Sequence, residues 1–355
     1  MKLINFWYSE GSWTLDPIAL SQSNLLVGEN SAGKSRTLEA LKACADFIAQ
    51  NGLAHTPFNM IGDIDCEMTF CDGDKTIKYA FRFSQSIVQS ESFSVIISDN
   101  ETQVVARDGE TCIVKGMKLN PPTNKLILHV RRDKDAYPEF EEIIQWAENT
   151  QILSFAKLKE DAMHSMRSKS QGIADYVSKL SQQQKKNVID NAARLNYKIN
   201  NFNSVEIDGG AKIILFEEEG VGQLPFFSMS SGMFRTLYVL ILLEYLANDT
   251  TPSMLLIDDL SEGLDYGRSI ELGKLLFDYC SRHNIDLLVS SNDNFLMDVV
   301  PIDKWIILNR EGTSVHNMSQ QTHPELFEDF SFTGLNNFSL FSSDFISRYS
   351  SSKQG

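Results

Sequence analysis

The chain has 355 residues, of which 42% are hydrophobic and 22% charged, a composition typical of a globular protein and not of a disordered or membrane-spanning one. Lys and Arg number 32 against 47 Asp and Glu, and the net charge of −15 does not favour a general nucleic-acid-binding surface, which needs clustered positive charge. The five cysteines form no C-x-x-C pair and no secretory or membrane-spanning segment is recognisable, so we expect a protein of the reducing cytoplasm, without zinc or disulfides.

Two strands and a helix are predicted at the beginning of the chain. Apolar runs at residues 2–8 and 24–28 are expected to be strands separated by turn residues. A helix is expected to run from Lys34 to Asn51, where Gly52 ends it. The residues that recur at helical spacing, and would form its buried face, are Leu38, Leu41, Ala45 and Ile48.

Residues 63–128 are predicted to form an antiparallel meander of hairpins, because apolar and polar residues alternate and Asp-Gly pairs interrupt the pattern. Amphipathic helices are expected from Pro138 to about residue 192, with no heptad pattern long enough for an extended coiled coil. After residue 205, apolar strands and helices alternate as far as the WIIL segment at residues 305–308. This alternation predicts an α/β fold with a mostly parallel sheet.

A phosphate-binding loop is predicted before the first helix, at GENSAGKS (28–35), which matches G-x-x-x-x-G-K-[ST] in full. Its glycines let successive backbone N–H groups turn toward a phosphate, and the helix directs its positive end to the same point. Lys34 would reach the β- and γ-phosphate oxygens of ATP, and the hydroxyl of Ser35 would bind Mg²⁺. The expected nucleotide-binding residues of the loop are Gly28, Glu29, Asn30, Ser31, Ala32, Gly33, Lys34 and Ser35.

A metal-binding carboxylate is predicted at the end of another buried strand. The apolar residues MLLI (254–257) lead directly into Asp258 and Asp259, which is the arrangement of a Walker B strand. Asp258 is therefore expected to hold Mg²⁺ through water. Asp259 lies where a general base for the attacking water is needed.

Two further motifs separate the families of P-loop proteins. MSSGM (229–233) precedes a long apolar helix, and LSEGLD (260–265) follows the Walker B strand. They resemble the signature motif and D-loop of ABC-type ATPases of the SMC/RecF/OLD-like group, and most closely those of ATPases from prokaryotic anti-phage defence cassettes. The resemblance extends to about residue 308 and implies an ABC-type ATPase head with a mostly parallel core sheet, an antiparallel β meander and a helical insert.

The resemblance also divides the chain into four expected units. Residues 1–135 would be a first ATPase lobe with the P-loop and the antiparallel β subdomain, and residues 136–204 the helical insert. Residues 205–320 would be a second lobe with the signature, Walker B and D-loop motifs. Residues 321–355 form a tail rich in Phe and Ser. Its phenylalanines are expected to pack on the sheet edge and the insert, or to dock onto a partner: Phe327, Phe330, Phe332, Phe338, Phe341 and Phe345.

In the family that the chain resembles, two ATP molecules lie between two protomers. The resemblance therefore implies a homodimer or larger oligomer in which Ser230, Ser231 and Gly232 of one copy contact the γ-phosphate held by the P-loop of the other. Arg235, one turn further along the helix, would add positive charge at the same phosphate. The simpler interpretation is that the two serines only cap the helix.

Two positions depart from the family pattern and predict slow ATP hydrolysis. Asp259 stands where the family has Glu, and its shorter side chain displaces the base unless the loop compensates or Glu262 takes the role. Asn292 occupies the position of the usual switch histidine and cannot take a proton near neutral pH. The candidate catalytic residues are Asp259, Glu262 and Asn292.

Other family elements have only weak candidates in the sequence. A Q-loop glutamine would be Gln85 or Gln89, and an aromatic residue stacked on adenine would be Trp7 or Trp13. The histidines show no metal-binding spacing and are expected to be structural.

The function expected from these features is that of an ATPase whose nucleotide state controls a partner effector supplied in trans, in an anti-phage defence setting. In OLD-like proteins a nuclease domain follows the ATPase, but only about fifty residues follow Val300 here, too few for such a domain, so a separate nuclease is one candidate effector. A second interpretation is a RecF- or SMC-like ATPase that binds DNA as an ATP-dependent dimer, which the acidic charge does not favour. A third is a scaffold that binds ATP and barely hydrolyses it.

Overall fold

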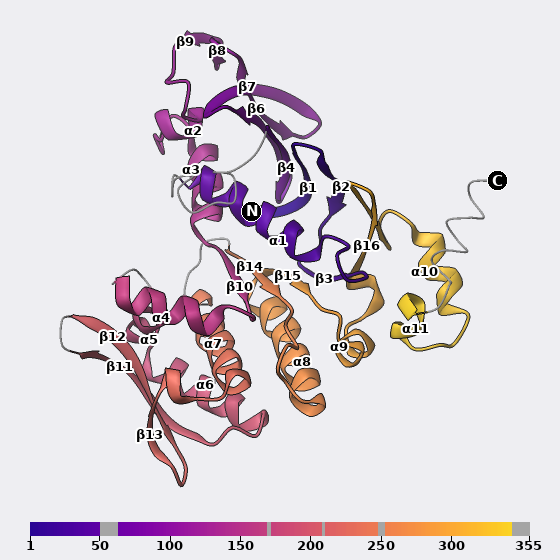
Figure 1. The fold of residues 1–355 in the computed structure, drawn as a ribbon. Helices are drawn as coiled ribbons and strands as arrows, with labels where there is room; N and C mark the ends of the chain where they lie inside the picture. Colours follow the sequence, from indigo (N-terminus) through magenta and orange to yellow (C-terminus); the bar gives the residue numbers. More distant parts are fainter. Residues whose placement is uncertain (50–62, 169–171, 208–209, 248–252, 343–355) are drawn as a thin grey trace.

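Two β-sheets and the helices around them make up the described part of the chain. The computed structural model describes residues 1–49, 63–168, 172–207, 210–247 and 253–342 (Figure 1). The larger sheet has 14 strands and the smaller has three. From one edge to the other, the strands of the larger sheet are β10 (Thr150–Ser154), β14 (Ser253–Asp258), β15 (Ile285–Ser290), β3 (Ser23–Val27), β16 (Trp305–Glu311), β17 (Ser314–Ser319), β2 (Trp13–Ala19), β1 (Lys2–Glu10), β4 (Ile64–Asp72), β5 (Lys75–Ser84), β6 (Ile87–Ile97), β7 (Asn100–Asp108), β8 (Thr111–Val114) and β9 (Met117–Leu119).

The first five strands in this order are parallel to one another. Parallel strands present their carboxyl ends at the same edge of a sheet, which is where open α/β sheets bind ligands. The loop after β3, Asp258 at the end of β14 and Ser290 at the end of β15 therefore come together at this edge.

Successive residues of these parallel strands face two separate hydrophobic cores. Leu255 and Ile257 belong to one core, whereas Met254 and Leu256 belong to the other, as expected for a side-chain period of two. Helices α7 (Ser231–Leu246) and α8 (Tyr266–His283) contribute to the first core. Helices α1 (Lys34–Ile48) and α3 (Pro138–Glu148) contribute to the second. Burial on both faces explains why the strands are continuously apolar in sequence.

The two helices of the second core follow the sequence pattern closely. α1 ends at Ile48 with Ala49 as its C-cap, and the predicted end at Asn51 and Gly52 lies outside the described residues. α3 begins at Pro138, whose fixed φ and missing N–H suit the first helical position. The residues predicted for the inner face of α1 are all fully buried: Leu38, Leu41, Ala45 and Ile48.

The other half of the large sheet is antiparallel from β1 through β4 to β9, which confirms the predicted meander of hairpins. The segment after it forms a short helix, α2 (Ile127–Val130), where the meander was expected to continue. Strand β2, which the sequence pattern did not reveal, pairs with β1 and, in parallel, with β17. The strand was not predicted because it contains Pro17, and a proline argues against a strand. The β1–β2 register shifts between Phe6 and Tyr8, opposite this proline, and proline is tolerated at such irregularities.

A second unit contains the three-stranded sheet and lies apart from the meander (Figure 1, lower left). The region of continuous helices expected from residue 138 to 192 is interrupted by β10, which adds to the large sheet beside β14. That expectation was wrong because a five-residue run such as TQILS cannot be told from part of a helix by periodicity. The elements of the unit are α4 (Leu158–Ser168), α5 (Ile173–Lys179), α6 (Gln182–Arg194), β11 (Ile199–Ile207), β12 (Ala211–Glu218), β13 (Gly222–Pro225) and the short 3₁₀ turn η3 (Phe226–Ser228).

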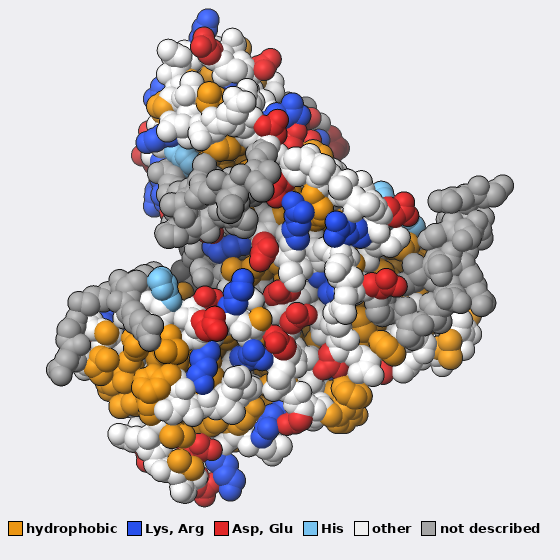
Figure 2. Space-filling model, viewed as in Figure 1, with side chains coloured by type: hydrophobic (Ala, Val, Ile, Leu, Met, Phe, Trp, Pro, Cys, Tyr) orange, Lys and Arg blue, Asp and Glu red, His pale blue; other side chains and the backbone are white. Residues whose placement is uncertain are grey.

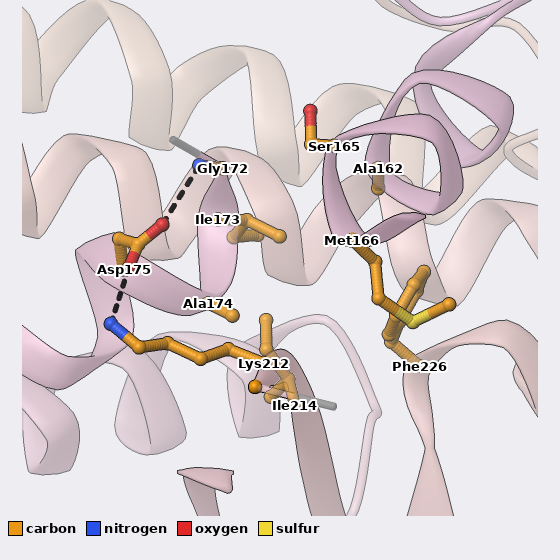
Figure 3. Close-up of a pocket in the computed structure, with 11 residues that line it drawn as sticks. Ala162, Ser165, Met166, Gly172, Ile173, Ala174, Asp175, Lys212, Ile214 and Phe226 are labelled. Atoms are coloured by element: carbon orange, nitrogen blue, oxygen red, sulfur yellow. Dashed lines mark hydrogen bonds and ion pairs between the residues drawn. The ribbon is translucent and has the colours of Figure 1, made fainter. Parts of the chain in front are cut away.

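A cavity of about 110 Å³ lies in this unit between α4, α5 and β12 (Figure 3). Asp175 at its rim accepts a hydrogen bond from the N–H of Gly172 at 3.1 Å and pairs with Lys212 at 2.7 Å. The hydrogen bond from Lys212 lowers the pKa of Asp175. The carboxylate therefore fastens the start of α5 to β12, and this pairing accounts for its charge without a ligand.

The C-terminal elements are α9 (Asn294–Val299), the 3₁₀ turn η4 (Ile302–Lys304), α10 (Pro324–Ser331) and α11 (Asn337–Ser342). Phe327 and Phe330 are buried in the first core, and Phe338 packs against it, in agreement with the packing interpretation of the tail. Phe332 is 81% exposed. The side chain of Phe341 and the whole of residue 345 lie outside the described part.

A buried carboxyl group fastens the meander to α2. Glu91 on β6 accepts hydrogen bonds from the N–H of Ile127 at 2.8 Å and from the hydroxyl of Tyr79 at 3.0 Å. Burial raises the pKa of Glu91 to about 7, although these hydrogen bonds oppose the shift. Nearby, Arg107 on β7 donates to the carbonyl oxygen of Lys125.

Glu91→Gln is expected to alter the pH dependence of stability. A carboxyl group whose pKa is raised by folding stabilises the protein fully below its unfolded pKa, and this contribution is lost as the pH rises through the folded value. A shift of this size corresponds to about 3 kcal/mol. The melting temperature of the wild type should therefore fall relative to that of the variant between about pH 5 and 8, whereas the exposed Glu101→Gln control should show a constant difference. A constant difference for Glu91→Gln as well would contradict the assignment.

Candidate nucleotide-binding site

The P-loop between β3 and α1 contains two positions that require glycine. A Cβ atom at Gly28 would lie 2.8 Å from the carbonyl oxygen of Leu308 on β16. Gly33 has a φ of +104°, and its Cβ would lie 3.1 Å from Val315. The loop therefore turns tightly into the first turn of α1, where N–H groups without intrahelical partners favour an anion.

Lys34 lies within this loop and is only 7% exposed. Its Nζ donates hydrogen bonds to the carbonyl oxygens of Gly28 at 2.8 Å and Glu29 at 3.0 Å. Burial lowers the pKa of Lys34, and the carboxylates of Asp259 and Asp258 act in the opposite direction. The amine is thus held by its own loop beside two acids, in the place where a phosphate-binding lysine is needed.

Asp258 at the end of β14 is bound by two hydroxyl groups. Its Oδ1 accepts hydrogen bonds from Ser35 at 3.0 Å and from Ser290 at 2.6 Å. Ser35 and Asp258 are the kind of pair with which P-loop proteins hold Mg²⁺, and hard oxygen ligands suit that ion. Within the described residues, no group of three or more His, Cys, Asp and Glu could hold a metal. Water and phosphate oxygens would therefore complete the ligand set.

Asp259 follows in a left-handed conformation, with a φ of 54°, which aspartate tolerates better than most residues. Its N–H donates to the hydroxyl of Ser290 at 3.0 Å, and the N–H of Leu260 donates to the carbonyl oxygen of Ser290 at 3.2 Å. Burial and the charge of Asp258 raise the pKa of Asp259, while Lys34 lowers it. A raised pKa brings the carboxylate closer to the range in which a general base is effective.

Ser290 is a site residue that the sequence analysis missed. It is fully buried at the last position of β15, and its hydroxyl joins the side chain of Asp258 to the backbone of Asp259. The signal is a polar residue that ends an otherwise apolar strand, two positions before Asn292. A second set of contacts links the D-loop to the loop after β15, because Ser269 lies 2.7 Å from Ser261 and 2.9 Å from Asp293.

One cleft of about 300 Å³ brings seven of the predicted site residues together, and its volume is at the lower end of the size range of ligand sites. Asn292 Nδ2 donates to Asn30 Oδ1 at 2.9 Å, so the loop after β15 is bound to the P-loop. The residues that line the cleft are Trp13, Asn30, Ser31, Gly33, Lys34, Ser35, Arg36, Asp259, Asn292 and Arg310.

Helix α7, which follows the predicted signature motif, begins beside the segment predicted as the D-loop of the same chain. Ser230 is the N-cap of α7, and its hydroxyl accepts a hydrogen bond from the N–H of Met233 at 3.3 Å, so the capping role is present. A Cβ atom at Gly232 would lie 2.7 Å from the carbonyl oxygen of Gly263, which means that the two backbones are in direct contact. Ser230 and Ser231 are both exposed and remain accessible for a second role.

Arg235 is bound to the D-loop, in contrast to the expectation that it serves a phosphate. Its Nη1 donates to the carbonyl oxygen of Glu262 at 2.6 Å, and its Nη2 lies 3.8 Å from the carboxylate of the same residue. Only 12% of the Arg235 side chain is exposed, because it also lies over the ring of Phe155. In this arrangement Arg235 supports the D-loop. The side chain of Glu262 lies at the surface, with its carboxylate near Arg235.

Of the four residues proposed as the adenine-stacking aromatic or the Q-loop glutamine, one lines the cleft and three do not. Trp13 lines the cleft. Trp7 lies within the β1–β4 ladder. Gln85 occupies the β5–β6 turn with a φ of 50°, and Gln89 follows on β6. The position of the two glutamines in the antiparallel half of the sheet gives no support to a Q-loop role.

The surface near the cleft carries charges of both signs. On the face shown in Figure 2, Lys and Arg side chains are interspersed with Asp and Glu. Arg36, which lines the cleft, pairs with Glu10 at 3.1 Å. This face therefore offers no continuous basic groove among the described residues. Across the described ranges, none of the helices is both long and apolar enough to cross a membrane.

Comparisons with known proteins agree with this geometry. The sequence model of a family described as "AAA domain, putative AbiEii toxin, Type IV TA system" matches residues 23–298. None of the curated proteins matches the chain. A solved SMC head bound to the C-terminal winged-helix domain of ScpA has a TM-score of 0.56 at 13% identity, over 92% of this chain and 100% of that chain. An SMC head with an extended coiled coil, bound to the C-terminal domain of ScpA and derived from Pyrococcus furiosus, has a TM-score of 0.50 at 10% identity, over 93% and 99%. At these identities the likeness concerns the fold, and it confirms the predicted ATPase-head architecture.

Proposed function

We propose that this chain, which belongs to the family described as "AAA domain, putative AbiEii toxin, Type IV TA system", binds ATP with Mg²⁺ in the cleft and hydrolyses it slowly. The observation that carries the proposal is the meeting of Lys34, the Ser35–Asp258 pair and Asp259 at one edge of the sheet. Lys34 would hold phosphate oxygens, and Ser35 and Asp258 would hold the metal. Mg²⁺, when bound, neutralises charge on the phosphates. Phosphate release measured with purified protein, ATP and Mg²⁺ tests the proposal.

Asp259 is the better candidate for the general base. It is half-buried in the cleft with a raised pKa, so it can accept a proton from a water held beside the phosphate. Glu262 is 46% exposed on its side chain and lies near Arg235. The backbone of Asp259 is in the left-handed conformation, which aspartate adopts more readily than glutamate. This conformation positions the shorter acid in the cleft.

The proposal includes a homodimer in which each signature helix completes the site of the other copy. Its support is the exposure of Ser230 and Ser231 at the start of α7, where a helix N-terminus and two hydroxyls can bind an anion. The chain's own P-loop is not bound to these serines in any described contact. A γ-phosphate from a second copy would give them a ligand.

Ser230→Arg is expected to abolish an ATP-dependent dimer while leaving ATP binding by the monomer intact, because the larger side chain blocks the approach of a second copy. Dimer formation is measured by light scattering with and without ATP. Ser181→Arg is the matched control, since Ser181 caps α6 in the same manner but lies in the insert. A Ser230→Arg protein that still dimerises with ATP would overturn the trans role.

We propose further that the nucleotide state controls a protein effector supplied in trans, with a nuclease as one candidate, in anti-phage defence. The support is the family description, which refers to a toxin of a toxin–antitoxin system. Co-expression with the product of the neighbouring gene tests it. The wild type should co-purify with this product in a nucleotide-dependent manner, and nucleotide-independent or absent association would contradict the proposal.

A DNA-binding ATPase is the second candidate, and its only support is the fold that the chain shares with SMC heads. Fold alone does not establish function, and the mixed charges in Figure 2 lack the basic surface that DNA requires. Nanomolar affinity for DNA at physiological salt, only with ATP, would favour this candidate. A scaffold that barely hydrolyses ATP would instead dimerise with ATP and show no turnover.

A further inference from the structure

Trp13 and Arg36 form a layered contact at one end of the nucleotide cleft. Trp13 opens β2, and Arg36 lies in the first turn of α1, two residues after Lys34. The guanidinium carbon of Arg36 lies 4.5 Å from the centroid of the Trp13 ring. Both residues line the cleft together with Lys34 and Ser35. The Trp13–Arg36 contact is therefore part of the same cleft in which the phosphates would bind.

The indole of Trp13 has no free face for a ligand. The residue is 3% exposed, because Arg36 covers it on one side, Tyr8 packs against it at 5.9 Å, and the position of a Cβ at Gly33 lies 3.7 Å from its ring. A base could stack directly on this ring only by displacing the arginine.

Arg36, in contrast, is oriented and accessible. Its Nη2 lies 3.1 Å from the carboxylate of Glu10, and this ion pair restrains the guanidinium beside the indole. Its side chain is 46% exposed and lines the cleft, so it is accessible to a ligand there. Guanidinium planes stack on nucleobases in many recognition sites, since both are flat and the base is rich in π electrons.

We propose that the base of the bound nucleoside triphosphate stacks on Arg36, whose guanidinium is held by Trp13 and Glu10. This inference rests on the proposed function and assigns the base-binding part of the same cleft. Trp13, one of the two aromatic residues predicted from sequence to stack on adenine, then acts beneath the arginine as a positioning residue and does not touch the base.

The test compares the binding of ATP and inorganic tripolyphosphate, which carries the phosphates without a base. Binding to the full-length protein is measured by calorimetric titration in the presence of Mg²⁺. Arg36→Ala and Arg36→Lys should each weaken ATP by about tenfold, the effect of losing one base-stacking contact. Arg36→Lys keeps the charge but not the planar group, and should leave tripolyphosphate affinity unchanged. Arg82→Ala, at an exposed arginine paired with Asp65 in the meander, should change neither affinity.

The possible results are separable. Equal weakening of ATP and tripolyphosphate by Arg36→Ala, restored by Arg36→Lys, would show that Arg36 serves the phosphates and would overturn the stacking role. Unchanged or tighter ATP binding in Arg36→Ala would place the base elsewhere, and also overturns it. If the folded wild type binds neither compound, the proposed function itself fails, whereas either result above leaves it standing.

Discussion

Lys34→Ala is expected to lower ATP affinity by about a hundredfold, the loss expected for removing charged hydrogen bonds of roughly 3 kcal/mol. Lys34 is the cation enclosed by the P-loop, with Gly28 and Glu29 as its present hydrogen-bond acceptors. A bound triphosphate would replace those neutral partners with anionic ones, and such bonds are about twice as strong. No other side chain of the loop supplies a positive charge at this point. Equilibrium titration with ATP and Mg²⁺ measures the loss.

The matched control is Lys42→Ala on the same helix. Lys42 pairs with Asp46 at 2.6 Å, one turn apart on α1, and does not line the cleft. Its removal takes away the same charge and should leave ATP affinity unchanged. Dimerisation and any biological output should be lost with Lys34→Ala, because the proposed function makes both depend on the nucleotide. ATP affinity retained in a folded Lys34→Ala protein would refute the site.

Asp259→Asn is expected to reduce the rate of ATP hydrolysis by about 10²- to 10⁴-fold, the contribution of a positioned general base, while ATP binding is kept. Asn is the suitable replacement because it tolerates the left-handed φ of 54° at this position, as Asp does. The variant should therefore accumulate the ATP-bound dimer. Single-turnover hydrolysis and light scattering, measured together, check both parts.

Glu262→Gln is the matched control for the base. Its carboxylate lies at the surface near Arg235, and its loss should alter the rate only severalfold. The pH profile gives independent support: because burial raises the pKa of Asp259, the rate should fall on the acidic side from a higher pH than for an ordinary aspartate. If Glu262→Gln loses the activity and Asp259→Asn keeps it, the assignment of the base is reversed.

The predictable parts of this protein are those encoded by short, local patterns. The P-loop and the Walker B strand were identified because each requires fixed residue types at adjacent positions, such as Lys34 and Asp258. α1 and α3 were identified because their apolar residues recur over several turns and because Pro138 marks a start. The parallel part of the large sheet was predicted from the alternation of strands and helices, but the order of its strands was not.

The missed parts depend on contacts between distant segments. β2 contains a proline, which is tolerated because the register shifts opposite it on β1. β10 can be recognised as a strand only from its pairing with β14. Ser290 acquires its role from the two acids at the end of β14. The position of Arg36 could not be predicted either, because it depends on contact with Trp13 on β2, a strand that was not predicted.

The bare contact between Gly232 and Gly263 has a mechanical consequence. No side chain lies between the two backbones to absorb a small displacement, so a push on the first turn of α7 must also move the segment around Gly263. That segment continues directly from Asp259, and Arg235, on the same helix α7, also binds it through the carbonyl oxygen of Glu262. A ligand that displaces Ser230 and Ser231 at the start of α7 would therefore also displace Asp259 in the cleft of the same chain.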